Sequence, residues 1–313
     1  MVKCGIIGLP NVGKSTLFNA LTRQHAPVAN FPFTTVEPNV GIVPVPDDRL
    51  QAITGVTGSR KMTPAAIEVT DIAGLVKGAH QGEGLGNEFL AHVRPLDALI
   101  QVVRAFDDPG VARSGSVSPE KDVAVIRTEL EAKDTEIAAR RGQEKGLAGE
   151  DIETTLTAKP VLYVHNTGED LRVPPSAAAL QPAVVLSGKL EAEFSELSEG
   201  DQRTFLEAYG LEHPRVRDVI PELLTLLDRI TFFTANENEA KAWLFPRGAT
   251  AWEAAGKVHS DFQRGFIRAE TIAWDALIRA GSYAAARERG LIRDEGKEYV
   301  VQDGNVLIFR VGG

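Results

Sequence analysis

The eight residues that most constrain what this chain can fold into lie near its start, where residues 8–15 read GLPNVGKS. They fit the pattern G-x-x-x-x-G-K-[ST] of the phosphate-binding P-loop. The residues before the motif, 2–7, are mostly apolar, as in a buried parallel strand. The residues after it, 15–22, place their apolar side chains on one helical face. A strand that leads through this motif into a helix is the context in which a P-loop binds phosphate.

The motif contains the residue types that triphosphate binding needs. Gly8 and Gly13 let the backbone curl, so that successive N–H groups point at phosphate oxygens. The helix N-terminus adds its partial positive charge. Lys14 can reach the β- and γ-phosphates as a catalytic cation, and the Ser15 hydroxyl can ligate Mg²⁺. The nucleotide-binding residues predicted from this motif are Asn11, Val12, Gly13, Lys14, Ser15 and Thr16.

The composition excludes several other classes of function. The net charge of −9 argues against bulk nucleic-acid affinity, and we expect no sequence-specific DNA partner. No apolar run approaches about 18 residues, so no membrane span is expected. The single cysteine, Cys4, cannot form an internal disulfide, and the first strand leaves no room for a signal peptide. Both features predict a cytoplasmic protein. The histidines show no metal-ligand spacing, so no zinc site is expected.

The loop after the first helix is a candidate nucleotide switch. Residues 28–41 contain Pro32 and Pro38, which keep the segment out of a helix. In P-loop switches this loop supplies a threonine to Mg²⁺ only while the γ-phosphate is present. Thr35 is the predicted Mg²⁺ ligand, and Thr34 is the alternative.

A second switch segment follows a strand predicted over 66–70. Asp71, at the tip of that strand, is placed to reach Mg²⁺ through water, and the N–H of Gly74 is placed to contact the γ-phosphate. Both residues are predicted to take part in catalysis. The glycine-rich stretch 77–87 is expected to order and disorder with the nucleotide. Many GTPases carry after that glycine a Gln that orients water. Because Leu75 stands there, another group must act or hydrolysis is slow.

A base-reading loop is predicted at 166–169, which read N-T-G-E after a strand over 159–166. In a doubly wound sheet such a loop belongs at the carboxyl end of a strand. A guanine reader has N-K-x-D there, whose Asp accepts two hydrogen bonds from guanine. The longer Glu169 crowds that geometry, Thr167 cannot lay an aliphatic stem along the base, and adenine can donate from N6 to Asn166 or to backbone. The motif therefore favours ATP, with a polar loop that contacts no base as the alternative. Ser187, in a later strand and loop, is expected near the base.

The remaining sequence predicts an α/β fold with two domains. A nucleotide-binding domain is expected over 1–228, with a helical insertion at 119–159, and a second domain over 229–313. The helical character of 190–227 ends near 228. Short strands are predicted in the second domain at 230–234, 271–274, 299–302 and 306–309.

Taken together, these stretches resemble the Obg-like ATPases of the YchF family, within the translation-factor-related P-loop GTPases. The resemblance is carried by 8–16, 30–39 (NFPFTTVEPN), 71–87 (DIAGLVKGAHQGEGLGN), 166–169, 256–270 (GKVHSDFQRGFIRAE) and 295–305 (EGKEYVVQDGN). It implies a Ras-like, doubly wound and mostly parallel domain with a helical insertion, and a C-terminal TGS domain of β-grasp type. It also implies hydrolysis of ATP to ADP and phosphate, ATP preferred over GTP through an N-x-x-E motif, Mg²⁺ as cofactor, and association with the ribosome.

The chain departs from the family pattern in two places. The insertion at 119–159 is shorter than the family's usual helical arm. Where the family usually has a histidine proposed to replace the missing Gln, this chain has Arg113, which cannot act as a base but can stabilise phosphate charge. Asn11 is a candidate ligand for K⁺ beside the phosphates, as in related enzymes that lack the Gln.

Two alternatives to an ATPase switch follow from the same residues. One is a GTPase of the same fold, and the other is a ribosome-binding module whose nucleotide site regulates docking while its turnover is incidental. Turnover measured with and without ribosomes separates the enzyme from the binding module.

Overall fold

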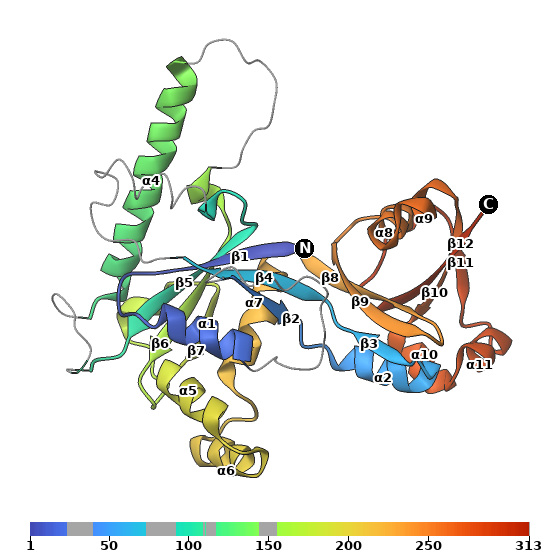
Figure 1. Ribbon diagram of the computed structural model, residues 1–313, viewed down its shortest axis with the longest axis horizontal. Coiled ribbons are helices and arrows are strands. Elements are labelled where there is room, and N and C mark those ends of the chain that lie inside the picture. The colour runs from blue at the N-terminus through green and yellow to red at the C-terminus, as the bar shows by residue number, and fades with distance from the viewer. Residues whose placement is uncertain (24–39, 73–91, 109, 111–116, 144–154, 313) are drawn as a thin grey trace. The chain divides into compact units, whose positions relative to one another are not determined.

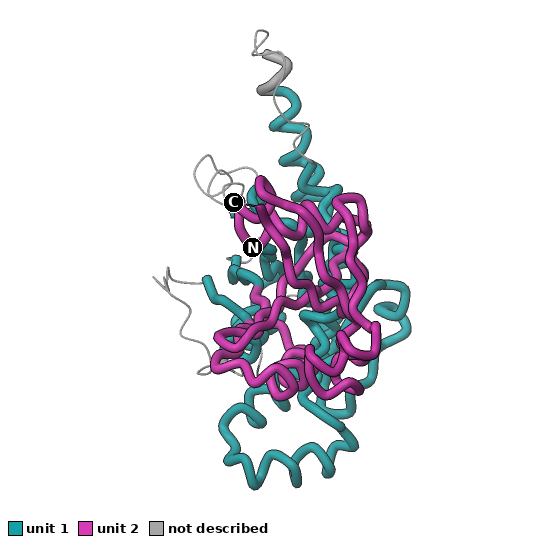
Figure 2. The backbone as a smooth tube through the Cα atoms, turned by 90° about the vertical axis from the view of Figure 1, so that its right-hand side faces the viewer, with its two compact units in different colours: residues 1–43, 67–227 teal, residues 44–66, 228–313 magenta. Residues whose placement is uncertain are grey.

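The computed structural model describes residues 1–23, 40–72, 92–108, 110, 117–143 and 155–312. They form two compact units, one of residues 1–43 and 67–227 and one of residues 44–66 and 228–313 (Figure 2). Several expectations lie outside the described residues: those for Thr34, Thr35, Gly74, Leu75, 77–87 and Arg113.

The first unit is built on a six-stranded sheet in the order β2-β4-β1-β5-β6-β7 (Figure 1). The strands are β1 (Val2–Ile7), β2 (Val40–Pro44), β4 (Ala66–Asp71), β5 (Ala98–Ala105), β6 (Val161–Thr167) and β7 (Ala183–Leu186). The pairs β1–β4, β1–β5, β5–β6 and β6–β7 are all parallel. The α/β class and the mostly parallel, Ras-like sheet expected from the sequence are therefore confirmed. The β2 strand lies at the sheet edge, the position that tolerates Pro44.

Helices and short 3₁₀ turns connect these strands. They are α1 (Lys14–Arg23), α4 (Pro119–Gln143), η2 (Leu156–Ala158), η3 (Pro175–Ala177), α5 (Gly188–Glu196), α6 (Glu199–Tyr209), η4 (Arg215–Asp218) and α7 (Val219–Leu226). The α4 helix packs against β5, and α7 packs against β6 and β7. Among the described residues, no helix is both long and apolar enough to cross a membrane.

The first half of α4 packs on the domain core. Ile126 and Leu130 are buried with Leu99 of β5 and Leu156 of η2. The Asp134 carboxylate ties the two ends of the insertion together, because it accepts a hydrogen bond from the Leu156 amide at 2.8 Å. The helix of residues 119–143 therefore starts on the core, whereas the sequence predicted an insertion that projects from it.

The second unit has its own mixed sheet in the order β11-β10-β12-β8-β9-β3. Its strands are β3 (Lys61–Thr63), β8 (Arg229–Ala235), β9 (Glu239–Pro246), β10 (Phe266–Ala273), β11 (Arg293–Glu295) and β12 (Asn305–Val311). Its helices are α2 (Asp48–Thr57), α8 (Ala251–Val258), α9 (Ser260–Arg264), α10 (Trp274–Ala280) and α11 (Tyr283–Glu288). The buried alanines of α8 pack against Phe232 and Phe245.

Residues 44–66 belong to this second unit, whereas the sequence placed them in the first domain. The β3 strand pairs in parallel with β9, and Lys61 forms an ion pair with Glu239 at 2.9 Å. Arg49 on α2 forms another with Asp303 at 2.6 Å. A three-residue strand carries almost no periodicity, so no local sequence pattern indicates this pairing.

The prediction of a strand over 299–302 is wrong. Within it Val300 forms only an isolated bridge, to Thr250. The Asn305 side chain accepts a hydrogen bond from the Gln302 amide at 2.9 Å, which turns the chain before β12 begins. The strands expected over 230–234 and 306–309 fall within β8 and β12, and the one expected over 271–274 overlaps β10 but runs one residue past its end, because Trp274 begins α10.

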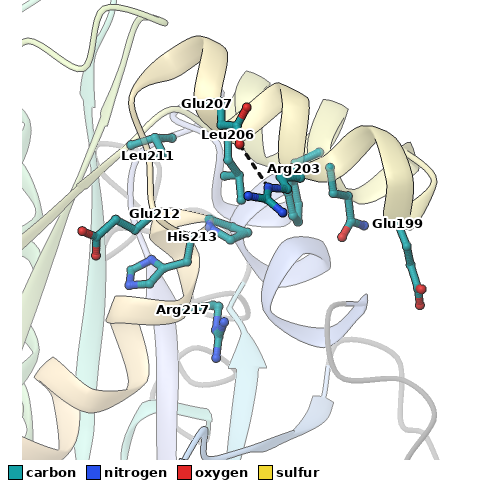
Figure 3. A pocket seen from close by; sticks show the side chains of 11 residues that line it. Glu199, Arg203, Leu206, Glu207, Leu211, Glu212, His213 and Arg217 are labelled. Carbon is teal, nitrogen blue, oxygen red and sulfur yellow. Dashed lines mark hydrogen bonds and ion pairs between the residues drawn. The ribbon is translucent and has the colours of Figure 1, made fainter.

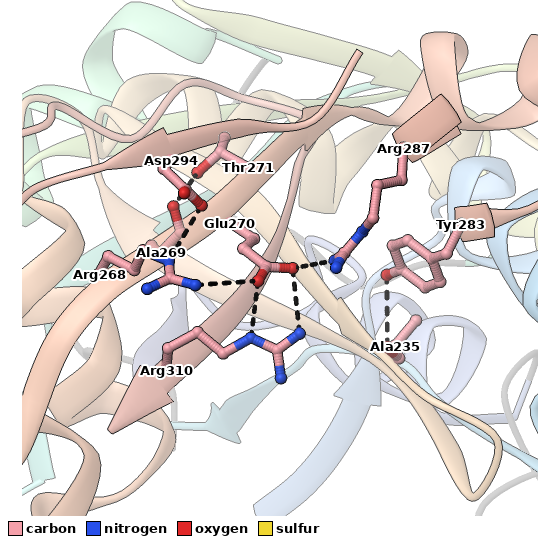
Figure 4. Close-up of polar contacts among 9 residues, drawn as sticks. All are labelled: Ala235, Arg268, Ala269, Glu270, Thr271, Tyr283, Arg287, Asp294 and Arg310. Atoms are coloured by element: carbon pink, nitrogen blue, oxygen red, sulfur yellow. Dashed lines mark hydrogen bonds and ion pairs between the residues drawn. The ribbon is translucent and has the colours of Figure 1, made fainter. Parts of the chain in front are cut away.

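A buried carboxylate cross-links three elements of the second unit (Figure 4). Glu270 on β10, only 5% exposed, accepts hydrogen bonds from Arg310 of β12 at 2.8 and 3.1 Å and one from Arg287 of α11. Arg268 lies beside it and donates to Asp294 at 3.1 Å. Because Arg268 and Arg310 oppose each other across the strand pair, the carboxylate offsets a like-charge contact.

A second buried carboxylate lies in the first unit. Glu191 of α5 is 4% exposed and accepts a hydrogen bond from the Val216 amide at 3.2 Å, which attaches η4 to the helix. Its Oε2 atom has no hydrogen-bond partner among the described residues. Burial, with a smaller contribution from Asp218, raises the pKa of the Glu191 carboxyl from 4.5 to about 7.

This pKa predicts a pH dependence of stability. Between pH 4.5 and about 7 the folded protein keeps the Glu191 proton and the unfolded chain releases it. The free energy of unfolding therefore falls as pH rises, by roughly 3 kcal/mol in total. We expect Glu191→Gln to remove this loss, because a neutral amide can still accept from Val216. Urea unfolding of both proteins at pH 5 and pH 8 measures it. An equal pH dependence in both would contradict the assignment to Glu191.

Candidate nucleotide-binding site

The carboxyl ends of β1, β4, β6 and β7 lie at one edge of the first unit's sheet. The strand register places Asp71 beside Ile6, at the end of β1, and Asn166 beside Leu186, at the end of β7. The chain leaves β1 at the point where the strand order reverses, with β4 on one side and β5 on the other. Ligands of open parallel sheets bind at this switch point, at the carboxyl ends of the strands.

The P-loop backbone depends on glycine at position 13. Gly13 has φ of 103°, a conformation that other residues rarely adopt. A Cβ atom there would overlap the side-chain amide of Asn166. That amide donates to the Val12 carbonyl at 2.8 Å, so the base-reading segment holds the P-loop directly.

The Lys14 side chain lies over the P-loop. Its Nζ atom donates to the carbonyl oxygens of Gly8 at 3.1 Å and Leu9 at 3.0 Å. Burial lowers the pKa of Lys14, and the nearby charge of Asp71 acts in the opposite direction. A half-buried ammonium with few partners gains from an anionic phosphate, which would supply the opposite charge.

The structure brings together two predicted Mg²⁺ ligands that lie far apart in the sequence. The Ser15 hydroxyl, in the first turn of α1, donates to Asp71 Oδ2 at 2.9 Å. The other carboxylate oxygen, Asp71 Oδ1, is buried and has no hydrogen-bond partner among the described residues. Buried polar atoms are normally satisfied, and hydroxyl and carboxylate oxygens are the ligands that Mg²⁺ prefers. These residues therefore fit a magnesium ion.

The other predicted P-loop residues line the same turn. Asn11 is exposed and has φ of 61°, a left-handed conformation that asparagine tolerates. Val12 is buried, and Thr16 is partly buried in the first helical turn.

The Asn166 side chain forms hydrogen bonds with two loops of the candidate site. Beyond its contact with Val12, its Oδ1 atom accepts a hydrogen bond from the Gly188 amide at 2.8 Å. It therefore joins the P-loop to the loop after β7. Oδ1 keeps a second lone pair, so a donor on a base can still approach it.

Thr167 and Ser187 have structural partners. Thr167 is buried, and its hydroxyl donates to the Leu186 carbonyl at 3.1 Å. The Ser187 hydroxyl caps α5 by accepting from the Leu190 amide at 3.5 Å. These two residues stabilise the loops in which base recognition was predicted.

Glu169 has two side-chain partners that the sequence analysis missed. Lys189 Nζ donates to Glu169 Oε1 at 2.5 Å, and the Tyr209 hydroxyl donates to Oε2 at 3.5 Å. Lys189 directly follows Ser187 and Gly188, so its position beside the base loop could have suggested the first contact. Tyr209 comes from the end of α6, 40 residues after Glu169, and no local pattern indicates it.

A separate cavity of about 580 Å³ lies between α6 and the segment 211–217 (Figure 3). Its lining includes Arg203, Leu206, His213 and Arg217, and it includes none of the predicted nucleotide-site residues. The candidate site is therefore the strand-end edge and not this cavity.

The fold and the site together define a P-loop nucleotide-binding protein of the Ras-like class. The family model described as "50S ribosome-binding GTPase" matches residues 3–141, and the YchF-GTPase C-terminal model, described as a protein of unknown function, matches residues 229–312. The "Ribosome-binding ATPase YchF" of Bacillus subtilis (strain 168) is 43% identical, and that of Escherichia coli O157:H7 is 40% identical, with 98% of both chains covered in each case. The chain belongs to the YchF family.

Two further findings describe its place in that family. The solved structure of the Schizosaccharomyces pombe YchF GTPase matches with a TM-score of 0.83 at 28% identity, covering 99% of this chain and 97% of that one. The alignment with the B. subtilis protein runs over 358 positions, against 313 residues here, so at least 45 of its positions are gaps in this chain. Gaps of this kind are expected if the helical insertion of this chain is shorter than that of its relatives.

Proposed function

We propose that this chain is a ribosome-associated ATPase whose nucleotide state acts as a conformational switch. The observation that carries the proposal is the contact between Ser15 and Asp71 beside Lys14, at the strand-end edge where a P-loop protein binds its triphosphate. Membership of a family whose curated relatives are named "Ribosome-binding ATPase" supports both the reaction and the partner.

In the proposed reaction, water attacks the γ-phosphorus of ATP. The new P–O bond forms as the bond to the β–γ bridging oxygen breaks, which releases ADP and phosphate. Lys14 and the P-loop amides hold the β- and γ-oxygens and take up their developing charge. The amide of Gly74 completes this set from the second switch segment. Intrinsic turnover is slow, because Leu75 cannot orient the attacking water.

The cofactor of the proposed reaction is Mg²⁺. Ser15 and Thr35 would ligate it directly, and Asp71 would hold it through water. When bound, the ion neutralises charge on the β- and γ-phosphates. Asn11 is the proposed ligand of a K⁺ ion beside the phosphates.

The proposed base is adenine. Asn166, Thr167, Glu169 and Ser187 form the base-reading region, and Glu169 stands where a guanine reader has Asp. We expect ATP to bind tighter than GTP by roughly tenfold, since the longer Glu169 crowds the guanine edge and Thr167 provides no aliphatic wall for the ring, and both features weaken guanine more than adenine. Competition titration measures both affinities, and GTP binding as tightly as ATP would contradict the proposed base.

The proposed organisation has a nucleotide-binding domain and a C-terminal TGS domain, with the ribosome as partner and the cytoplasm as compartment. Residues 229–313 would form the TGS domain, together with the segment 44–66 that packs with them. No membrane and no sequence-specific DNA enter the proposal.

The test measures ATP and GTP turnover by the full chain, alone and with ribosomes, against ribosomes alone. We expect slow ATP hydrolysis, co-sedimentation with ribosomes, and lower GTP turnover. Co-sedimentation without turnover would indicate a regulatory binding module, and faster hydrolysis of GTP would indicate a GTPase. Turnover without any ribosome association would remove the proposed partner.

A further inference from the structure

The carboxylate of Glu169 is already occupied within the protein. Its Oε1 atom lies 2.5 Å from Lys189 Nζ, and its Oε2 atom lies 3.5 Å from the Tyr209 hydroxyl. The contact with Lys189 lowers the pKa of the Glu169 carboxyl and raises that of the Lys189 ammonium, so the pair is charged at neutral pH.

Both partners are attached to fixed parts of the first unit. Lys189 is the second residue of α5, whose start is held by the Ser187 cap and by the hydrogen bond from Gly188 to the buried Asn166. Tyr209 is the last residue of α6, and its ring packs on Phe205 with centroids 4.9 Å apart. The side chain of Glu169 is thus directed towards Lys189 by groups that come from two different helices.

This arrangement acts differently on the two purine bases. A guanine edge offers two donors, N1–H and N2–H₂, and needs a carboxylate whose two oxygens are free to accept both. Lys189 and Tyr209 each already use an acceptor site on one of these oxygens, so guanine can engage Glu169 only by sharing or displacing them. Adenine has no N1–H and makes no such demand, so it loses nothing when Glu169 stays paired. Discrimination can arise from a cost imposed on the wrong ligand as well as from contacts to the right one.

We propose that Lys189 and Tyr209 are specificity-determining residues that disfavour guanine by occupying the Glu169 carboxylate. The proposal rests on the proposed adenine nucleotide site and assigns it two residues outside the N-x-x-E motif. Neither residue needs to touch the base.

The test is a double-mutant cycle on the full chain, with the ratio of ATP to GTP affinity as the readout. Each affinity is measured by displacement of a fluorescent ADP analogue. Lys189→Met frees the carboxylate, and we expect the ratio to move towards GTP by about fivefold, the scale of one exposed ion pair. Tyr209→Phe removes the weaker contact, and we expect about twofold. In a Glu169→Gln background no carboxylate remains, and Lys189→Met should leave the ratio unchanged.

The matched control is Arg203→Met, which breaks an exposed ion pair with Glu207 on the same α6 helix and should not change the ratio. An unchanged ratio in Lys189→Met would overturn the proposal. So would an equal change in the Glu169→Gln background, because the effect would then not pass through the carboxylate. A parent protein that prefers GTP would contradict the proposed base, while the change on substitution would still decide the role of Lys189.

Discussion

Lys14→Ala is expected to abolish tight triphosphate binding. In the proposed site the ammonium would make charge-assisted hydrogen bonds to two phosphate groups, each worth about 1.5–3 kcal/mol, so ATP affinity should fall by at least about 100-fold. ADP, which lacks the γ-phosphate, should lose less. Calorimetric titration with ATP and ADP in the presence of Mg²⁺ measures both losses.

The fold should survive this substitution. The Nζ contacts of Lys14 are to carbonyl oxygens of its own loop, so the free energy of unfolding should change by less than about 1 kcal/mol. The matched control is Lys3→Ala. Lys3 lies at the start of β1, the strand that leads into the P-loop, and it forms an ion pair with Glu68 of β4. This variant should bind ATP like the parent. Unchanged ATP affinity in Lys14→Ala would remove the P-loop from the proposed function.

Asp71→Asn is expected to slow nucleotide turnover and to weaken the binding of Mg²⁺. The amide keeps an oxygen that accepts the Ser15 hydrogen bond but loses the charge directed at the ion. Metal-dependent stabilisation of the transition state is worth several kcal/mol, so kcat should fall by about 100-fold or more. The Mg²⁺ concentration for half-maximal turnover should rise. A titration of ATPase rate against Mg²⁺ measures both quantities.

Asp97→Asn is the control for this substitution. Asp97 precedes β5 and accepts a hydrogen bond from the Lys3 amide at 2.8 Å, at the end of the sheet opposite the site. Its replacement should leave kcat and the Mg²⁺ dependence unchanged. If Asp71→Asn behaved in the same way, Asp71 would have no role at the metal and the orphaned Oδ1 atom would need another partner.

The parts of this protein that the sequence predicted well are those encoded by local pattern. Residues 2–23 contain a strand, a P-loop and a helix in immediate succession, and the spacing of GLPNVGKS alone identifies the chemistry. Asp71 could be placed at a strand end because alternating apolar residues lead directly to it. The class of sheet follows from such strand–turn–helix units, since parallel strands need crossover connections.

Tertiary structure decided the features that depend on pairing between distant segments. Asn166 holds Val12 across 154 residues, and Glu169 meets Tyr209 across 40. The strand Lys61–Thr63 joins the sheet of the second unit, although the chain before residue 44 and directly after residue 66 belongs to the first. Sequence periodicity reports which face of an element is buried, but it does not report which partner covers that face. The P-loop and the proposed metal ligands could therefore be named from residue types and their spacing, whereas the partners of the Glu169 carboxylate depend on how α5 and α6 pack beside it.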